Sequence, residues 1–276
     1  MTTQKRVGVI GWPVEHSLSP AMHNAAFRAL GMDDWLYDLV PIPPDILRQS
    51  LRTLKDEGGY VGVNVTVPHK ERVLPYVRPD DRAQAIGAVN TIDFRGYKAT
   101  NTDVVGFMND LAAHDIDVEG ASVLVIGAGG AARAAVYGLA EAGGQLSIVN
   151  RTQERAQRLI NDLNIQAQIV DWRSVEAVQP ALIVNCTSVG MWPKVDDCVW
   201  PDDVSFPEHV TVYDMVYRPQ QTRLMTKAEA RGGRAITGLG MLVRQGAAAF
   251  EIWTGNEAPV DVMFEAVEAA LRERAE

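Results

Sequence analysis

The chain has few cysteines, scattered histidines and no excess of positive charge. Its two cysteines are Cys186 and Cys198, and without a CxxC pair they indicate neither a disulfide framework nor a zinc knuckle. We interpret both as structural thiols of a reducing compartment. The five histidines form no HExxH motif or comparable spacing, so the sequence predicts no metal site.

The charge balance is acidic, with 26 lysines and arginines against 35 aspartates and glutamates and a formal net charge of -9. A surface that follows nucleic-acid phosphates needs clustered cations, so nucleic acid is not an expected partner, although a basic pocket for one phosphate is allowed. No apolar run approaches the roughly 20 residues of a membrane helix, and strand-like sequence begins where a signal-peptide core would lie. We therefore expect a cytoplasmic protein without a membrane partner. The sequence leaves the oligomeric state open between monomer and homodimer.

Apolar, β-branched segments alternate with segments of helical period along most of the chain. This alternation is typical of parallel strands joined by helical crossovers, and it predicts an α/β fold. The first part suggests helices that begin near Ser19 and Pro44, and a hairpin or bent strand over 89–100. Strands are predicted at 6–10, 35–41, 61–67, 122–126, 168–171, 182–185 and 210–214, with further helices starting at Asp103 and Gln220 and covering 241–253.

A glycine-rich turn follows the predicted strand at 122–126, and a second strand-helix repeat starts at Gln145. A dinucleotide-binding turn needs small residues at three positions: one for the tight turn, one where the pyrophosphate approaches and one for close helix packing. These positions are filled by Gly127, Gly129 and Ala132. The free N–H groups and the positive end of the next helix would face the phosphates. Because this turn lies between a strand and a helix of small residues, it predicts a dinucleotide site. The α/β structure before it is interpreted as a substrate domain.

The residues that follow the second strand of this unit favour NADP over NAD. An NAD site usually has a carboxylate here for the ribose 2′-hydroxyl, and none is present. The strand ends instead in Asn150, Arg151 and Thr152, with Arg155 one helical turn after Arg151. Two guanidinium groups beside amide and hydroxyl donors suit a 2′-phosphate. Two solvated arginines at the start of a surface helix are the alternative interpretation.

Polar residues also occur where apolar ones are expected in the first hundred residues. Asn64 and Thr66 alternate with valines along a strand that ends at a lysine, so Thr66 and Lys70 are expected near the carboxyl end of the sheet, where α/β proteins place ligands. The other members of this set are Ser17, Ser19, Asn90, Asp103 and, far along the chain, Gln245. Small donors and acceptors of this kind suit a polyhydroxylated substrate. Taken singly, each residue also fits a helix cap or a turn, and Gln245 also fits a surface position.

Eight motifs occur in one order: HSLSPAMHN, NVTVPHK, GAVNT, NTD, GAGGAAR, NRTxxR, DMVYRP and GLGMLVRQ. In that order the chain resembles the shikimate dehydrogenase family, from Val7 to about Trp253. The resemblance implies reversible oxidation of shikimate to 3-dehydroshikimate with NADP, within chorismate and aromatic amino acid biosynthesis. It also implies two α/β domains: a substrate-binding catalytic domain at 1–103 with 240–276, and a Rossmann-type NADP-binding domain at 104–239.

The resemblance further implies residue roles. Lys70 and Asp103 are the expected catalytic pair. Shikimate contacts are expected from Ser17, Ser19, Thr66, Lys70, Asn90, Asp103, Tyr217 and Gln245. NADP contacts are expected from Gly127, Ala128, Gly129, Gly130, Ala131, Asn150, Arg151, Thr152 and Arg155, with Met215 and Gly238 near the nicotinamide.

The reaction chemistry gives the lysine two alternative roles. Hydride leaves a carbinol carbon only as the hydroxyl proton leaves, so an acid/base group is needed beside that oxygen. Burial would favour a neutral Lys70 that transfers the proton, whereas a neighbouring Asp103 would favour a cation that stabilises the developing alkoxide. Two other functions fit the same motifs less well. A quinate/shikimate dehydrogenase would often use NAD, and a non-catalytic sensor would not need both residues.

Overall fold

The computed structural model describes residues 4–274 and divides the chain into two compact units. Unit 1 ends at Gly106 and resumes at Leu242, and unit 2 is Phe107–Met241. The chain passes from one unit to the other inside helix α4 (Asp103–Ala113) and returns inside helix α8 (Leu239–Thr254). Each unit contains its own β-sheet, which confirms the predicted α/β class with two domains.

Unit 1 is built on a mixed six-stranded sheet in the order β2-β1-β3-β5-β6-β4. The strands are β1 (Lys5–Gly11), β2 (Trp35–Pro41), β3 (Tyr60–Val65), β4 (Arg78–Pro79), β5 (Thr91–Asp93) and β6 (Lys98–Thr100). Strand β1 pairs in parallel with β2 and β3, whereas β5 runs antiparallel to both β3 and β6. The hairpin expected over 89–100 is therefore confirmed as β5 and β6.

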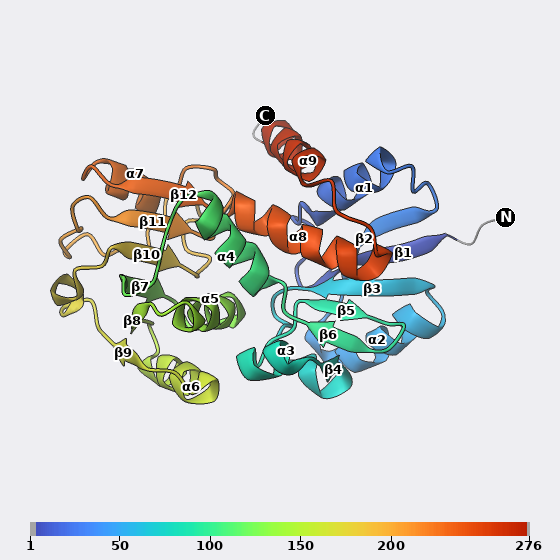
Figure 1. The fold of residues 1–276 in the computed structure, drawn as a ribbon, viewed down its shortest axis with the longest axis horizontal. Coiled ribbons are helices and arrows are strands. Elements are labelled where there is room, and N and C mark those ends of the chain that lie inside the picture. The colour runs from blue at the N-terminus through green and yellow to red at the C-terminus, as the bar shows by residue number, and fades with distance from the viewer. Residues whose placement is uncertain (1–3, 275–276) are drawn as a thin grey trace. The chain divides into compact units, whose positions relative to one another are not determined.

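Helices cover both faces of this sheet, with α2 and α3 on one side and α1 and α8 on the other (Figure 1). The helices and 3₁₀ turns of the unit are α1 (Ser19–Ala29), η1 (Pro44–Ile46), α2 (Leu47–Asp56), η2 (Leu74–Tyr76), α3 (Asp81–Ile86) and α9 (Val260–Glu273), besides part of α8. On the α1 side, His23 contacts the rings of Phe27, Phe250 and Trp253 and joins them in one aromatic cluster. The indole of Trp253 lies against Gly62 and donates to the Ile92 carbonyl, 3.0 Å away, so no larger residue fits at Gly62.

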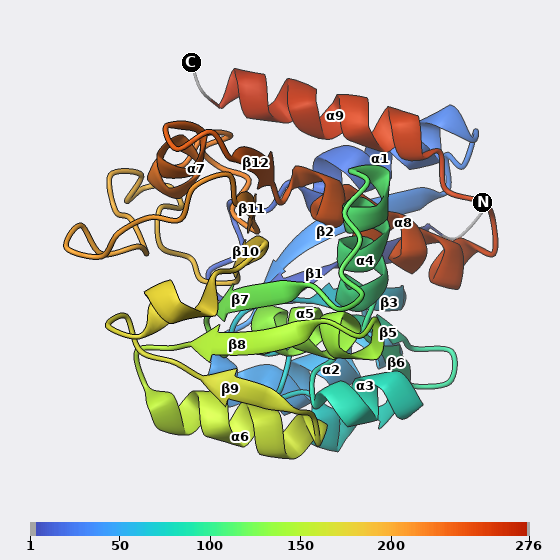
Figure 2. The same cartoon turned by 60° about the vertical axis from the view of Figure 1, so that its left-hand side comes forward.

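Unit 2 has an all-parallel sheet in the order β12-β11-β10-β7-β8-β9. Its strands are β7 (Ser122–Ile126), β8 (Gln145–Val149), β9 (Ala167–Ile169), β10 (Leu182–Asn185), β11 (Thr211–Asp214) and β12 (Arg234–Thr237). Figure 2 shows the arrows of β7, β8 and β9 side by side and pointing the same way. All six carboxyl ends therefore meet at one edge, where a parallel α/β sheet places its ligand.

Alternate residues of the central strand β7 in unit 2 enter two separate cores. Val123 and Val125 pack with helices α5 (Gly130–Glu141) and α6 (Gln153–Leu163), whereas Leu124 and Ile126 pack with Trp200 and helix α7 (Arg223–Glu229). The link between β9 and β10 contains only the 3₁₀ turn η3 (Val175–Val178).

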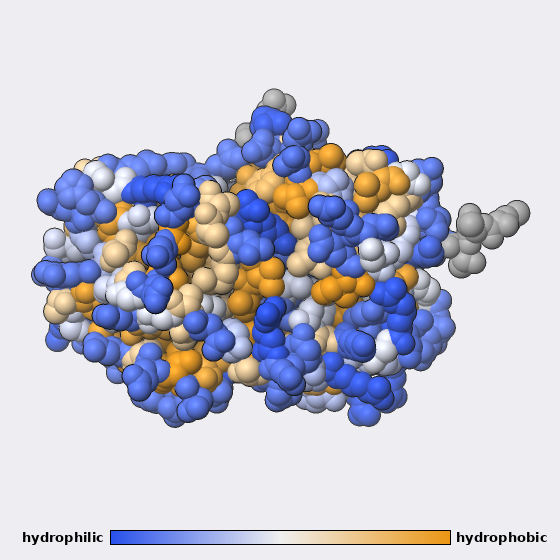
Figure 3. Space-filling model, viewed as in Figure 1, coloured by the Kyte–Doolittle hydropathy of each residue, from blue (hydrophilic) through white to orange (hydrophobic). Residues whose placement is uncertain are grey.

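Hydrophilic residues predominate on the surface in view, with hydrophobic ones in small separate groups between them (Figure 3).

The structure corrects several predicted boundaries. The strand predicted at 61–67 ends at Val65, so Thr66 and Lys70 lie in the following loop. The helix expected from Gln220 begins at Arg223, because Thr222 caps it by accepting from the Met225 N–H. The short elements that were not predicted are η2, β4, α3, η3 and β12, whereas α9 agrees with the C-terminal helices expected from the resemblance.

Candidate functional site

The candidate residues fall into two sets, one in each unit. Unit 1 holds Ser17, Ser19, Thr66, Lys70, Asn90, Asp103 and Gln245. Unit 2 holds Tyr217 and every residue expected to contact NADP.

An ion pair between Lys70 and Asp103 is the chemical centre of unit 1. The Lys70 Nζ donates to Asp103 Oδ2 over 2.6 Å, and the two side chains are 15% and 6% exposed. Lys70 lies in the loop after β3, and Asp103 is the first residue of α4. The Asn101 side chain accepts from the Asp103 N–H at 3.0 Å, which fixes the start of that helix. The two predicted catalytic residues are thus brought into direct contact.

Asn90 connects this ion pair to the surrounding polar side chains. Its amide nitrogen donates to Asp103 Oδ1 at 2.9 Å and to Gln245 Oε1 at 3.2 Å. Its amide oxygen accepts from the Thr102 N–H at 2.7 Å and from the Thr91 hydroxyl at 3.1 Å. Gln245 is 9% exposed, so its interpretation as a surface residue is wrong.

Two further residues, neither of them an expected substrate contact, extend the network deeper into unit 1. Asn64 donates to the Asn90 carbonyl and to the Thr91 hydroxyl, at 3.1 Å in each case. The Tyr37 hydroxyl donates to Asn64 Oδ1 over 2.7 Å. Asn64 is 5% exposed within the otherwise apolar strand β3. A buried amide among valines was the available signal, because a buried polar group needs hydrogen-bond partners.

The two serines at the start of α1 lie on either side of its N-cap residue, Leu18. The Ser17 hydroxyl accepts from the Ser19 N–H at 3.2 Å, and it lies 3.2 Å from the Ser19 hydroxyl, to which it donates. Thr66, in the loop after β3, donates its N–H to the Ile10 carbonyl at 2.9 Å. The alternative interpretation of these serines as helix caps is compatible with the contact that Ser17 makes, and their contact with the substrate stays a prediction.

In unit 2 the glycine turn adopts the conformation that a phosphate-binding turn needs. Gly127 has a φ of +114°, a value that other residues rarely adopt, and its N–H donates to the Val149 carbonyl at 2.8 Å. Gly129 is the N-cap residue of α5, and a Cβ placed there would meet no atom within 4 Å. The first N–H groups of α5 have no side-chain cap, so they are available to an anion.

The basic residues after β8 also fit a phosphate. Arg151 and Arg155 are both exposed, and in the described residues neither guanidinium has an ion pair or a hydrogen bond. Asn150 donates to the Thr152 carbonyl at 2.7 Å, which closes the turn that carries Arg151 into α6. Two unpaired cations, one in this turn and one in the first turn of α6, without a carboxylate directly after β8, match the ribose 2′-phosphate of NADP.

The loops after β11 and β12 come together at the same edge of the sheet. A Cβ at Gly238 would collide with the Met215 backbone, so only glycine allows this approach. Asp214 is fully buried and accepts from Asn185 at 2.9 Å and from the Thr222 hydroxyl at 2.7 Å. Burial raises the pKa of Asp214, and these donors partly offset that rise. The hydrogen-bonded carboxyl group of Asp214 fixes the start of the loop that contains Met215 and Tyr217.

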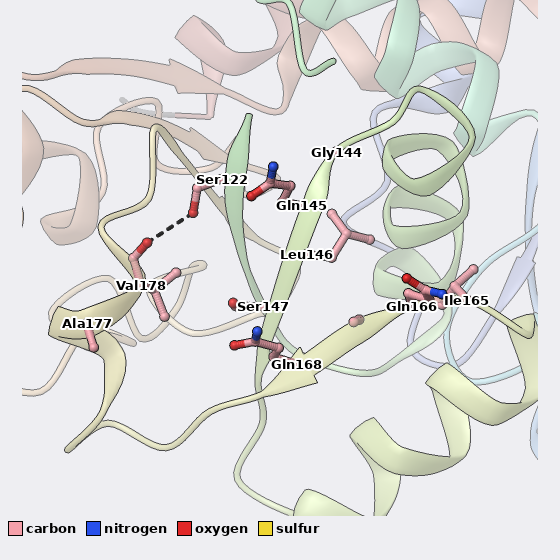
Figure 4. A pocket seen from close by; sticks show the side chains of 11 residues that line it. Ser122, Gly144, Gln145, Leu146, Ser147, Ile165, Gln166, Gln168, Ala177 and Val178 are labelled. Carbon is pink, nitrogen blue, oxygen red and sulfur yellow. Dashed lines mark hydrogen bonds between the residues drawn. The ribbon is translucent and has the colours of Figure 1, made fainter. Parts of the chain in front are cut away.

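A cavity of about 720 Å³ in unit 2 does not belong to this site (Figure 4). It lies over β7, β8 and β9, where the short link to β10 leaves the sheet without a helix. Ser122 donates to the Val178 carbonyl at 3.1 Å on its wall, and Ser147 and Gln168 line it as well. The cavity has no charged lining residue and includes neither the glycine turn nor Arg151.

No group of three or more histidine, cysteine, aspartate or glutamate side chains in residues 4–274 could hold a metal ion. Over the same residues, no helix is both long enough and apolar enough to cross a membrane.

A glycine turn with phosphate-binding features in one unit, and a buried lysine–aspartate pair among amides and hydroxyls in the other, define a dinucleotide-dependent oxidoreductase with a small polar substrate. Family models agree with both halves. Residues 9–92 match the family model described as shikimate dehydrogenase substrate binding domain. Residues 110–189 match the model for shikimate/quinate 5-dehydrogenase, and residues 238–268 match the model for the shikimate 5′-dehydrogenase C-terminal domain. The chain belongs to the shikimate dehydrogenase family.

Individual relatives match the chain over nearly its whole length. The shikimate dehydrogenase (NADP(+)) of Symbiobacterium thermophilum is 44% identical, over 96% of this chain and 94% of its own. That of Methanopyrus kandleri is 45% identical over 96% of each chain. The crystal structure of shikimate 5-dehydrogenase from Thermus thermophilus, in complex with NADP(H) and shikimate, is 38% identical with a TM-score of 0.88, over 97% of this chain and all of that one.

Proposed function

We propose that the lysine–aspartate pair of unit 1 carries the proton-transfer step of an NADP-dependent shikimate dehydrogenase. The chain is an oxidoreductase that interconverts shikimate and 3-dehydroshikimate with NADP(H), a reaction of aromatic amino acid biosynthesis. One observation carries the residue assignment: the 2.6 Å contact between Lys70 and Asp103, enclosed by donors and acceptors from separate parts of the chain.

Shikimate binding is assigned to the polar cluster of unit 1. The contacts proposed for it are Ser17, Ser19, Thr66, Lys70, Asn90, Asp103 and Gln245, together with Tyr217 from unit 2. The geometry around Asn90 supports this assignment, because its amide is oriented by partners on every side. An oriented donor set recognises a polyhydroxylated ring without rearranging, so less free energy is lost to ordering.

The proton of the reacting hydroxyl is assigned to the Lys70–Asp103 pair. As the hydride leaves the carbinol carbon, the pair takes up the hydroxyl proton, and it returns that proton to the carbonyl oxygen in the reverse reaction. In this assignment Lys70 faces the reacting oxygen. Asp103 orients the Lys70 side chain, since Lys70 Nζ and Asp103 Oδ2 lie 2.6 Å apart. Asn90 fixes the other oxygen of Asp103, at 2.9 Å, and thereby the direction of the lysine.

NADP binding is assigned to unit 2, where the cofactor supplies the hydride acceptor and donor. The glycine turn and the N-terminus of α5 would hold the pyrophosphate, through Gly127, Ala128, Gly129, Gly130 and Ala131. The 2′-phosphate contacts would come from Asn150, Arg151, Thr152 and Arg155. Met215 and Gly238 would adjoin the nicotinamide, on loops that Asp214 holds in place.

The domain roles, location and assembly extend this proposal. Residues 1–103 with 240–276 would form the substrate-binding catalytic domain, and 104–239 the NADP-binding domain. The two unpaired thiols, Cys186 and Cys198, support a reducing, cytoplasmic location. A homodimer is the assembly to test, and sedimentation velocity separates a 30.2 kDa species from one of twice that mass.

Steady-state kinetics with two substrates and two cofactors test the function. Purified enzyme is assayed with shikimate and with quinate, each against NADP and NAD. We expect the highest kcat/KM with shikimate and NADP. Equal kcat/KM for NADP and NAD would refute the cofactor site. Equal kcat/KM for quinate and shikimate would make this an enzyme of relaxed specificity.

Replacement of Lys70 separates its catalytic role from a binding role. Lys70→Ala should lower kcat about a hundredfold or more and change the KM for shikimate much less, because the proton is transferred only in the chemical step. Lys55→Ala removes an equal charge from α2 and should leave both constants unchanged. Near-normal turnover of Lys70→Ala would exclude this residue from the proton transfer.

A further inference from the structure

We propose that unit 1 carries a second ligand site, a cleft of about 420 Å³ that binds a small organic polyanion. Its cationic groups are Arg48 and Arg52 on α2 and Arg78 on β4. The other residues that line it are apolar or aromatic: Leu51, Pro75, Tyr76, Val77 and Tyr97. No residue of the lysine–aspartate cluster lines this cleft, so the site would be separate from the substrate site.

Three cations gather in this cleft without an acidic partner. Within residues 4–274, none of the three guanidinium groups has a hydrogen bond or an ion pair, and no carboxylate lines the cleft. Arg48 and Arg52 are four residues apart on one helix, a spacing at which like charges repel. Asp80, close to Arg78 in sequence, is already engaged because its side chain caps α3 through the Ala83 N–H at 2.7 Å.

The overall charge of the protein is opposite in sign to that of this arginine cluster. With a net charge of -9, most of the surface repels anions, so an isolated group of unpaired guanidinium groups attracts them locally. Guanidinium groups bind phosphate and carboxylate oxygens in a bidentate manner, so three of them suit a ligand with two or more negative charges. The charge arrangement therefore points to a polyanion and not to a neutral molecule.

The two tyrosines add a surface for the carbon skeleton of such a ligand. Tyr97 has a φ of +54°, a left-handed conformation that is strained in a tyrosine. Its ring packs edge-on against Phe94 at 5.9 Å between centroids, and the Lys55 Nζ lies 4.2 Å from the ring centroid. Tyr76 remains 40% exposed. Because the unusual backbone of Tyr97 places an aromatic wall beside three cations, we assign the cleft to an organic anion with an apolar part.

Isothermal titration calorimetry tests the site, with pyrophosphate and citrate as probes of phosphate and carboxylate recognition. The titrations are made at constant ionic strength and with saturating NADP, so that phosphate sites of unit 2 are already filled. We expect a saturable heat with a Kd below about 1 mM for at least one probe. Absence of a saturable heat with both probes would overturn the proposal.

Charge-matched variants locate the binding. Arg48→Gln/Arg52→Gln should weaken it at least tenfold, and Arg78→Gln, on a different element, should weaken it as well. Arg158→Gln/Arg231→Gln removes two arginines from elsewhere on the exposed surface and should leave the Kd unchanged. Equal weakening by both double variants would show general charge attraction and refute a defined cleft. Urea unfolding of each variant confirms that its fold is retained.

Discussion

The buried histidine of α1 should make the stability of unit 1 depend on pH. His23 is fully buried and stacks on Tyr37, with ring centroids 4.2 Å apart. Neither of its ring nitrogens has a hydrogen-bond partner. Burial without a partner disfavours the charged ring, and it lowers the pKa of His23 from 6.5 to about 3.

The direction of the effect follows from the two pKa values. Because the folded pKa lies below the unfolded one, the unfolded chain takes up a proton first as the pH falls, and stability decreases between pH 6.5 and about pH 3. Each pH unit within this window changes the free energy of unfolding by about 1.4 kcal/mol. At about pH 5, roughly 1.5 units below the unfolded pKa, His23 should lower the free energy of unfolding by about 2 kcal/mol relative to neutral pH.

Urea unfolding at about pH 7.5 and about pH 5 measures this loss. Between these values the wild type should lose about 2 kcal/mol more than His23→Phe, whose ring cannot be protonated. His69, whose pKa burial also lowers, leaves a residual dependence in both proteins. His209→Gln changes an exposed histidine and should behave as the wild type does. The same pH dependence in His23→Phe and the wild type would refute the reasoning.

Three substitutions test other parts of the structure. Arg151→Ala should raise the KM for NADP about tenfold or more with little change in kcat, since a 2′-phosphate contact is made equally in ground and transition states. Tyr37→Phe strands the buried Asn64 oxygen, so urea unfolding should show a loss of about 1–3 kcal/mol, and kcat/KM for shikimate should fall about tenfold. Gly240→Ala places a methyl group against the buried carboxylate of Asp110, and should lower the free energy of unfolding by about 1–3 kcal/mol.

Each substitution has a control and a contradicting outcome. Arg151→Ala should leave turnover with NAD unchanged, and an unaltered NADP preference would count against the phosphate contact. Tyr60→Phe removes a hydroxyl that donates to Asp38 at 2.9 Å, outside the polar network, so its kcat/KM should match the wild type. Similar kinetics for Tyr37→Phe would show that the network does not orient the site. Wild-type stability of Gly240→Ala would mean that Asp110 moves aside without cost.

Sequence patterns predicted the local features of this protein well. The glycine turn and its flanking strand and helix are contiguous, so their composition alone identifies them. The same holds for α4, because Asp103 opens an apolar helix with only two residues between it and the end of β6. The short elements α3 and β12 were missed, since six and four residues carry too little periodicity to be recognised without their tertiary contacts.

The contacts that make the site were beyond sequence patterns. Lys70 and Asp103 lie 33 residues apart, and Asn90 and Gln245 lie 155 apart, so only the fold decides that they touch. Family resemblance brought these residues into one group, but it did not give their hydrogen bonds. Tyr37 was assigned to a strand and no more, although its hydroxyl supports Asn64. A tyrosine in a strand has many possible partners, and sequence alone does not select among them.

The path of the chain through its two units has a consequence for synthesis. Unit 2 is a continuous stretch of chain, whereas unit 1 is interrupted between Gly106 and Leu242. On the ribosome, the sheet of unit 1 is therefore made first but waits for Phe250 and Trp253, which complete its aromatic cluster. Until α8 and α9 emerge, the apolar face beside α1 stays uncovered while unit 2 already has its whole core. The aromatic cluster of unit 1 therefore closes only after the whole of unit 2 has been made.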